Sequence, residues 1–151
     1  MAEYPTPHVF LYGVFMKDCV KHIQIHTLVK SWARAEMPGA KLYQLATGLP
    51  VAVEDNSESK VYGEVMTFSD MEGAMRIIDA QEGFRADAPG QSRMLKEVRE
   101  VTISSGGEKL KALVYLLPKE KFNPTVERAV LAHGGDWRKF VMMPRFDGYE
   151  H

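Results

Sequence analysis

The sequence predicts an α+β fold in which a small antiparallel or mixed sheet is combined with a few helices. Three strand candidates follow one another closely: 40–45, which is closed by Gly48; 51–53, which ends in the turn-rich residues 54–57; and the alternating run 61–68. Residues 95–103 and 109–117 flank the turn Ser105-Gly106-Gly107-Glu108 and predict a hairpin. Strands this close together leave no room for the crossover helices of a doubly wound sheet.

Length and composition indicate one soluble domain over residues 1–151. The chain has 19 Lys and Arg against 20 Asp and Glu, a net charge of −1, so it has no bulk attraction for nucleic acid or an anionic membrane. One cysteine excludes an intramolecular disulfide and a thiolate zinc cluster. No signal peptide or membrane-spanning run is present, so we expect a cytoplasmic protein. The oligomeric state is left open.

The remaining elements follow from local patterns. His8 to Tyr12 predicts a buried strand ended by Gly13, and residues 17–35 are mixed and predict a helix. The clearest helix begins at Ser69, which has capping-box spacing with Glu72, and stops at Gly83. A last helix is expected to begin near Asn123, with Pro124 at its first position, and to stop at residues 134–135. The tail over 136–151 has no clear period.

Glu82 is the strongest catalytic candidate. It falls in the last turn of the predicted helix 69–83, where the helix dipole is negative and a carboxylate is poorly stabilised. Partial burial there would raise its pKa and make it a useful general base near neutral pH. The alternative is an ordinary solvated glutamate at a helix end.

The segment from Leu11 to Met16 is a second candidate. A strand that breaks at a glycine can turn backbone N–H groups toward a ligand and form an oxyanion or anion site. The alternative is a simple strand end. No glycine-rich run followed by Lys-Ser or Lys-Thr occurs, so this is not a phosphate loop.

Metal and covalent chemistry have less support. His22 and His26 have the spacing of two ligands on one helical face, but no third ligand follows and surface histidines are the simpler interpretation, so no metal site is expected. No serine has a nucleophile-elbow context, and Cys19 has no evident activating partner beyond His22.

Several short motifs occur along the chain in a fixed order, and their order is more specific than any single motif. The sequence resembles the gamma-glutamylcyclotransferase-like family over about residues 8–117. The matching motifs are Val9-Phe10-Leu11-Tyr12-Gly13, Met37-Pro38-Gly39-Ala40-Lys41-Leu42-Tyr43, Gly48-Leu49-Pro50, Val61-Tyr62-Gly63-Glu64-Val65, Ile78-Asp79-Ala80-Gln81-Glu82-Gly83-Phe84 and Ala112-Leu113-Val114-Tyr115. Residues 118–151 lie outside these motifs and are expected to form a C-terminal helix and tail.

The resemblance implies a small, mostly antiparallel, barrel-like sheet with flanking helices. It implies an enzyme that cyclises a small γ-glutamyl compound to 5-oxoproline and releases the attached amine, with no metal or organic cofactor. Glu82 matches the family's general acid/base, and Tyr115 matches a tyrosine that lines its pocket. The loop whose backbone holds the glutamyl end of the substrate corresponds to Tyr12, Gly13, Val14, Phe15 and Met16.

Two departures from the family pattern leave rival functions open. The family loop usually has Ser or Thr where Val14 stands here. A family Tyr-x-Arg has no clean counterpart, because Met94-Leu95-Lys96-Glu97 occupies that region, and Arg93 is a possible substitute. The rivals are a non-catalytic module that binds a small ligand on the same fold and a related acyl-transfer enzyme.

Overall fold

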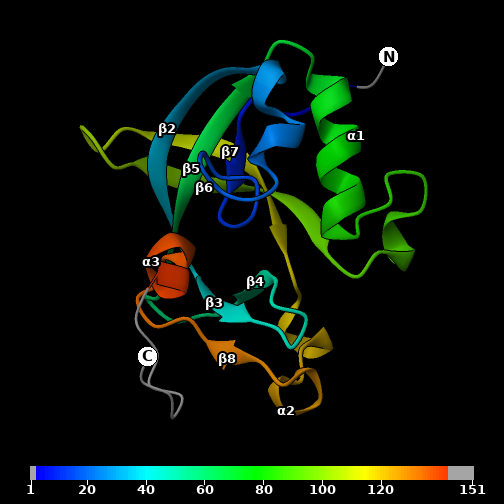
Figure 1. Ribbon diagram of the computed structural model, residues 1–151, viewed down its shortest axis with the longest axis vertical. Coiled ribbons are helices and arrows are strands. Elements are labelled where there is room, and N and C mark those ends of the chain that lie inside the picture. Colours follow the sequence, from blue (N-terminus) through cyan, green and yellow to red (C-terminus); the bar gives the residue numbers. More distant parts are fainter. Residues whose placement is uncertain (1–2, 143–151) are drawn as a thin grey trace.

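A closed barrel of five strands forms the larger part of the computed structural model, which describes residues 3–142 (Figure 1). Its strands are β1 (Val9–Leu11), β2 (Val29–Pro38), β5 (Lys60–Phe68), β6 (Leu95–Ile103) and β7 (Lys109–Leu116), in the order β1-β5-β2-β6-β7. Neighbouring strands are antiparallel, except that β1 and β7 close the barrel in parallel, with Val9 opposite Leu113. The α+β fold with a barrel-like, mostly antiparallel sheet is confirmed, as is the hairpin of β6 and β7.

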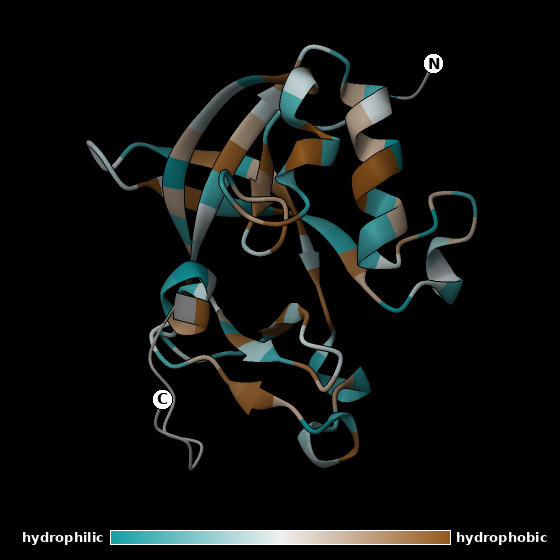
Figure 2. Ribbon diagram, viewed as in Figure 1, coloured by the Kyte–Doolittle hydropathy of each residue, from teal (hydrophilic) through white to brown (hydrophobic). Residues whose placement is uncertain are grey.

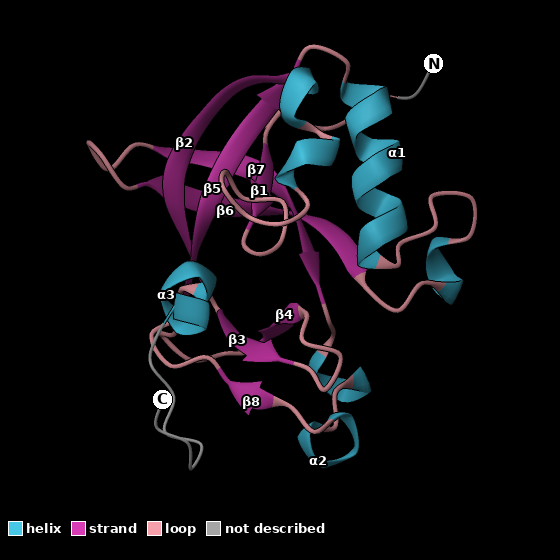
Figure 3. Ribbon diagram, viewed as in Figure 1, coloured by secondary structure: helices cyan, strands magenta, loops and turns pink. Residues whose placement is uncertain are grey.

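A second, three-stranded sheet lies beside the barrel (Figure 3). It consists of β3 (Ala40–Gln44), β4 (Pro50–Glu54) and β8 (Val130–Leu131), in the order β4-β3-β8. The end of β7 connects the two sheets, because the N–H of Leu117 donates to the carbonyl of Ala52 at 2.9 Å. The two predicted strands over 40–45 and 51–53 therefore exist but belong to this small sheet.

The helix predicted over residues 17–35 is wrong. The chain forms two single 3-10 turns, His22–Gln24 and His26–Leu28, and then enters β2. Residues 30–36 include good helix formers, but β2 pairs with β5 from Val29 opposite Phe68 to Pro38 opposite Lys60. This long ladder fixes the segment as a strand against its local preference.

Helix α1 (Met71–Glu82) packs along one side of the barrel (Figure 1). Its buried face includes Ala74, Met75 and Ile78, which pack in the core. The cap differs from the prediction: the carboxylate of Asp70, not Ser69, accepts the N–H of Gly73 at 2.9 Å. The helix ends at Glu82, before Gly83 with a φ of 75°.

The C-terminal segment differs from the expected single helix. α2 (Pro124–Glu127) begins as predicted, with Asn123 as its cap and Pro124 first, but Arg128 at a φ of 52° ends it after 4 residues. β8 then pairs with β3, with Leu131 opposite Tyr43, and α3 (Trp137–Met142) follows. Residues 143–151 of the predicted tail lie outside the described part.

The core has one cluster that fills the barrel and extends to the small sheet and α3, and a second cluster between the barrel and α1. β1 contributes to both, because Phe10 faces the first while Val9 and Leu11 face the second. Figure 2 shows the hydrophobic residues along the barrel strands and α1. A Cβ on Gly63 would lie 2.4 Å from the carbonyl oxygen of Leu11, so only glycine lets β5 approach β1 this closely. No helix within residues 3–142 is both long and apolar enough for a membrane span.

Candidate active site

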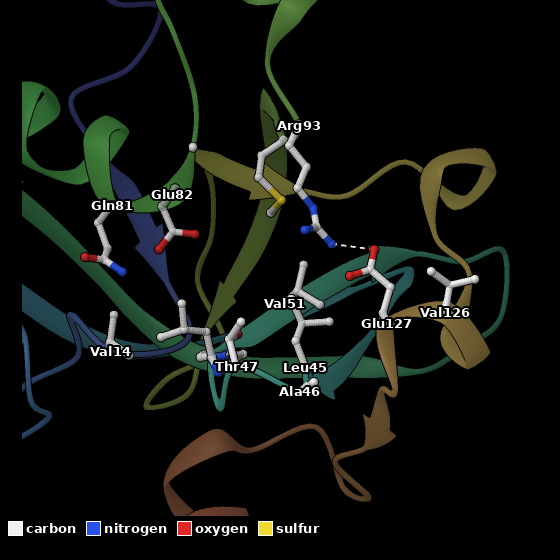
Figure 4. Close-up of a pocket in the computed structure, with 14 residues that line it drawn as sticks. Val14, Leu45, Ala46, Thr47, Val51, Gln81, Glu82, Arg93, Val126 and Glu127 are labelled. Carbon is white, nitrogen blue, oxygen red and sulfur yellow. Dashed lines mark hydrogen bonds and ion pairs between the residues drawn. The ribbon is translucent and has the colours of Figure 1, made fainter.

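Glu82 borders a pocket of about 420 Å³ where the barrel meets the small sheet. α1 presents Gln81 and Glu82 to it, the loop after β1 presents Val14, and the β3–β4 turn presents Leu45 to Thr47 and Leu49 (Figure 4). Among the described residues, none makes a hydrogen bond or ion pair with the Glu82 carboxylate, so this group is available to a ligand.

Burial raises the pKa of Glu82 from 4.5 to about 7. The cause is loss of solvation, which disfavours the charged carboxylate in a low-dielectric site. The position of Glu82 in the last turn of α1 acts in the same direction, because carbonyl groups concentrate negative potential there. Glu82 therefore has the proton affinity that a general acid/base needs near neutral pH.

A small cavity behind the pocket brings together most of the predicted site residues. It is lined by the loop after β1, by Glu82 and by Tyr115 on β7, and it includes Tyr12, Gly13, Val14 and Phe15. Met16 is not among its lining residues; it is buried in the core cluster that also contains Phe10 and Trp137. The structure thus gathers every predicted site residue except Met16 around Glu82.

The loop after β1 offers backbone donors beside this cavity. In the part of the chain that the structure describes, no hydrogen bond uses the N–H groups of Gly13, Val14 and Phe15. Val14 and Phe15 are nonetheless buried, with 7% and 1% of their surfaces exposed. Buried backbone donors are rarely left unpaired, so these three form a candidate site for a carboxylate or an oxyanion.

Three contacts hold this loop in place. His22 Nδ1–H donates to the carbonyl of Phe15 at 2.9 Å, and the N–H of Lys21 donates to the carbonyl of Val14 at 2.9 Å. A Cβ on Gly13 would lie 2.4 Å from Cγ of Pro50, so only glycine lets β4 approach this closely. The sequence pattern placed Gly13 at a strand end but could not reveal its partner Pro50.

Tyr12 and Tyr115 have different surroundings. The Tyr12 hydroxyl donates to the carbonyl of Tyr115 at 2.8 Å and accepts the N–H of Ala52 at 3.2 Å, so it fastens β1 to β7 and β4. The Tyr115 hydroxyl donates to the carboxylate of Asp79 on α1. Burial first, and Asp79 second, raise the pKa of Tyr115, which therefore acts as a neutral donor.

Asp79 is also held by a cation. Lys96 Nζ on β6 lies 2.9 Å and 3.1 Å from the two carboxylate oxygens of Asp79, and both side chains are largely buried. The same ammonium lies 4.7 Å from the ring centre of Phe84. Lys96, Asp79 and Tyr115 thus form a charged network beneath the last turn of α1.

Arg93, the possible counterpart of the arginine in the family Tyr-x-Arg motif, lines the pocket. Its guanidinium pairs with Glu127 of α2 at 2.6 Å, across the pocket from Glu82 (Figure 4). Neither the ion pair nor the contribution of the β3–β4 turn was predicted. The ion pair and the position of the β3–β4 turn both depend on contacts between segments more than 30 residues apart in the sequence. Such contacts cannot be predicted from a local sequence pattern.

The two histidines do not form the suggested pair on a helical face. His22 and His26 lie on separate 3-10 turns with their rings 5.5 Å apart, and His22 is engaged with Phe15. Within residues 3–142, no group of three His, Cys, Asp or Glu side chains could hold a metal ion. Burial raises the pKa of the Cys19 thiol, which is the reverse of activation.

Comparisons with known proteins identify the family of this chain and its fold. The family model described as "Gamma-glutamyl cyclotransferase, AIG2-like" matches residues 9–139, well beyond the residue-117 limit of the sequence motifs. A search of curated protein sequences gives no significant match.

Solved structures share the fold at low sequence identity. The crystal structure of a mouse AIG2-like protein is 16% identical with a TM-score of 0.59, over 95% of this chain and 88% of that one. A solution structure from Arabidopsis thaliana is 21% identical with a TM-score of 0.56, over 78% and 72%. YkqA from Bacillus subtilis is 21% identical with a TM-score of 0.63, over 91% and 41%.

Proposed function

Because the chain belongs to the AIG2-like gamma-glutamyl cyclotransferase family, we propose that it converts a small γ-glutamyl compound to 5-oxoproline and a free amine or amino acid. One observation carries the proposal. The Glu82 carboxylate, with its pKa raised to about 7, faces a pocket next to three buried backbone N–H groups that have no partner within the described residues. We propose Glu82 as the general acid/base and no metal or organic cofactor.

The mechanism needs only these groups. Glu82 takes a proton from the α-ammonium of the substrate, and the resulting amine attacks the substrate's own γ-carbonyl carbon. A C–N bond forms and closes a five-membered ring, so the intramolecular geometry supplies much of the acceleration. The N–H groups of Gly13 to Phe15 stabilise the negative charge on the carbonyl oxygen.

The second half returns the proton. Glu82 donates it to the leaving nitrogen, the original amide C–N bond breaks, and the carbonyl re-forms in the ring. The remaining extra proton of the ring nitrogen passes to the departing amine. The products are therefore a neutral lactam and the ammonium form of the amine, and Glu82 is again a carboxylate.

A non-catalytic ligand-binding module is the second candidate, and Val14 is the observation that favours it. The family loop usually carries a hydroxyl at this position, and Val14 supplies none. Since the proposed oxyanion contacts use backbone N–H groups, the cyclotransferase does not require that hydroxyl.

The test is the release of 5-oxoproline from a panel of γ-glutamyl amino acids, γ-glutamylamines and glutathione. The cyclotransferase produces 5-oxoproline and free amine in equal amounts from at least one compound. Saturable binding of a compound without turnover by the folded protein would favour the binding module. Transfer of the glutamyl group to an added amine, without 5-oxoproline, would favour an acyl-transfer enzyme.

A further inference from the structure

A second hollow, of about 610 Å³, adjoins the Glu82 pocket. The two share Val14, Thr47 and Leu49, so these residues form the boundary between them. The second hollow continues over the outer face of β2, where it is lined by Trp32 and Arg34, and over Lys17 in the loop after β1. No part of the proposed chemistry at Glu82 uses this space.

The charges in the second hollow differ from those in the Glu82 pocket. Glu64 is fully buried, and its carboxylate forms an ion pair with Arg138 at 3.0 Å and accepts the backbone N–H of Lys17 at 2.7 Å. Among the described residues, the side chains of Lys17 and Arg34 form no ion pair, and Asp18 is the only other unpaired charge that lines this hollow. The hollow therefore has an excess of positive charge.

The cation in the Glu82 pocket is already neutralised. Arg93 there is paired with Glu127 at 2.6 Å. An anionic group on the far side of the scissile amide would meet the unpaired cations Lys17 and Arg34 if it extends across Val14 toward β2. If it extends toward α2, it would meet Arg93, whose charge is already paired with Glu127.

The second hollow also exposes apolar surface. Trp32 is 41% exposed and Leu49 37% exposed, and Lys17 Nζ lies 4.6 Å from the ring centre of Trp32. Large exposed apolar side chains that line a concavity, with a few charges among them, are typical of small-molecule sites. The hollow is therefore lined by both apolar side chains and unpaired cations.

We propose that this hollow is the subsite for the leaving half of the substrate. It selects γ-glutamyl amides whose leaving amine carries both an apolar or aromatic side chain and a carboxylate. Trp32 contacts the side chain, and Arg34 binds the carboxylate. This inference rests on the proposed cyclotransferase activity at Glu82. The γ-glutamyl end occupies the Glu82 pocket, and the amide crosses the boundary beside Val14 and Thr47.

Three substrates with different leaving groups test the selection: γ-glutamyl-phenylalanine, γ-glutamyl-phenethylamine, which lacks the carboxylate, and γ-glutamyl-diaminopentane, which carries a cation. We expect kcat/KM to fall in that order. Arg34→Gln should lower kcat/KM about tenfold for the phenylalanine compound and less than about twofold for the phenethylamine compound, because only the first loses a charge-assisted contact. Trp32→Ala should lower both.

Lys30→Gln is the matched control, because Lys30 is an exposed cation on the same strand and does not line the hollow. It should leave all three substrates unchanged. Equal turnover of the three compounds, or an Arg34→Gln loss that is the same for the phenylalanine and phenethylamine compounds, would overturn the subsite and leave the cyclotransferase standing.

Binding to Glu82→Gln protein separates the subsite from the chemistry. Titration with γ-glutamyl-phenylalanine should give a saturable change in tryptophan fluorescence, and adding Arg34→Gln should weaken the binding about tenfold. If the wild type releases no 5-oxoproline, this saturable binding still supports the subsite, and only the proposed activity fails. Absence of a saturable change would overturn the subsite.

Discussion

The hydroxyl of Tyr115 donates a hydrogen bond to Asp79, which lies three residues before Glu82 on α1. Lys96 holds the same carboxylate at 2.9 Å, so β7 and β6 are both fastened to the helix just before the proposed base. The turn of α1 that leads to Glu82 is thus fastened to the barrel by a buried network that does not itself contain Glu82.

Replacing Tyr115 by Phe tests whether this network positions Glu82. The variant keeps the ring and its contact with Phe84 but removes the donor to Asp79. We expect a loss of about 1–2 kcal/mol in the free energy of unfolding, because the buried Asp79 carboxylate loses one partner. We expect kcat to fall about tenfold, with a smaller change in KM, because Glu82 is less well positioned.

Tyr62→Phe is the control, since Tyr62 is partly exposed on β5 and does not line the Glu82 pocket. It should retain full activity. Wild-type kcat in Tyr115→Phe would show that Glu82 is positioned without the network.

The pH dependence of activity follows from the pKa of Glu82. Because that pKa is raised to about 7, Glu82 is mostly protonated at pH 6 and mostly ionised at pH 8. A base must be ionised to accept a proton, so kcat/KM should rise about tenfold per pH unit below pH 7 and level off above it. Steady-state rates from pH 5 to 9 measure this limb. A limb centred near pH 4.5 would contradict burial as the source of the basicity.

The free energy of unfolding should depend on pH in the opposite direction to the activity. The folded protein binds a proton at Glu82 up to about pH 7, whereas the unfolded chain releases it near the ordinary value of 4.5. Between these values the folded state holds more protons, so the free energy of unfolding falls as pH rises, in total by about 3 kcal/mol. Glu82→Gln removes this pH-dependent loss, so the stability of the variant relative to wild type should increase as the pH rises from 4.5 to 8.

Urea unfolding at pH 4.5 and pH 8 measures the difference. The same pH dependence in wild type and Glu82→Gln would mean that Glu82 titrates alike in the folded and unfolded states.

Arg138 is expected to be a structural residue of the C-terminal segment. Arg138→Met leaves the buried Glu64 carboxylate with the N–H of Lys17 as its remaining partner among the described residues. An uncompensated buried charge destabilises the folded state. Because Arg138 is itself partly exposed, we expect less than the full cost of breaking a buried pair, a loss of about 2 kcal/mol in the free energy of unfolding. Arg85→Met is the control, since Arg85 pairs with Asp87 on the surface and such pairs contribute about 0.5 kcal/mol. Equal losses in urea unfolding would contradict this role.

Patterns within single elements were sufficient for much of this structure. The alternation in 61–68, the hairpin turn at 105–108 and the stop at Gly83 each depend on neighbours in the chain, and each was predicted from the sequence. Glu82 could be chosen for the same reason, since its place at the end of an amphipathic helix is a local property.

Other features depend on distant contacts and had no local signal. β2 is a strand because β5 pairs with it, although its own residues favour a helix. The third wall of the Glu82 pocket comes from the β3–β4 turn, and Glu64 gave no sign that it is buried opposite Arg138. Burial of charge and the meeting of separate loops are decided by the assembled barrel.

The most direct test of the account is 5-oxoproline release by wild type, Glu82→Gln and Glu72→Gln with the best γ-glutamyl substrate at pH 8. Glu72 lies in the first turn of α1, exposed and outside the pocket, so Glu72→Gln keeps the wild-type rate. We predict that Glu82→Gln loses at least about a thousandfold in kcat, because the amide neither accepts the ammonium proton nor donates one to the leaving nitrogen. Undiminished release by folded Glu82→Gln protein would contradict the account, because another residue would then have to be the base.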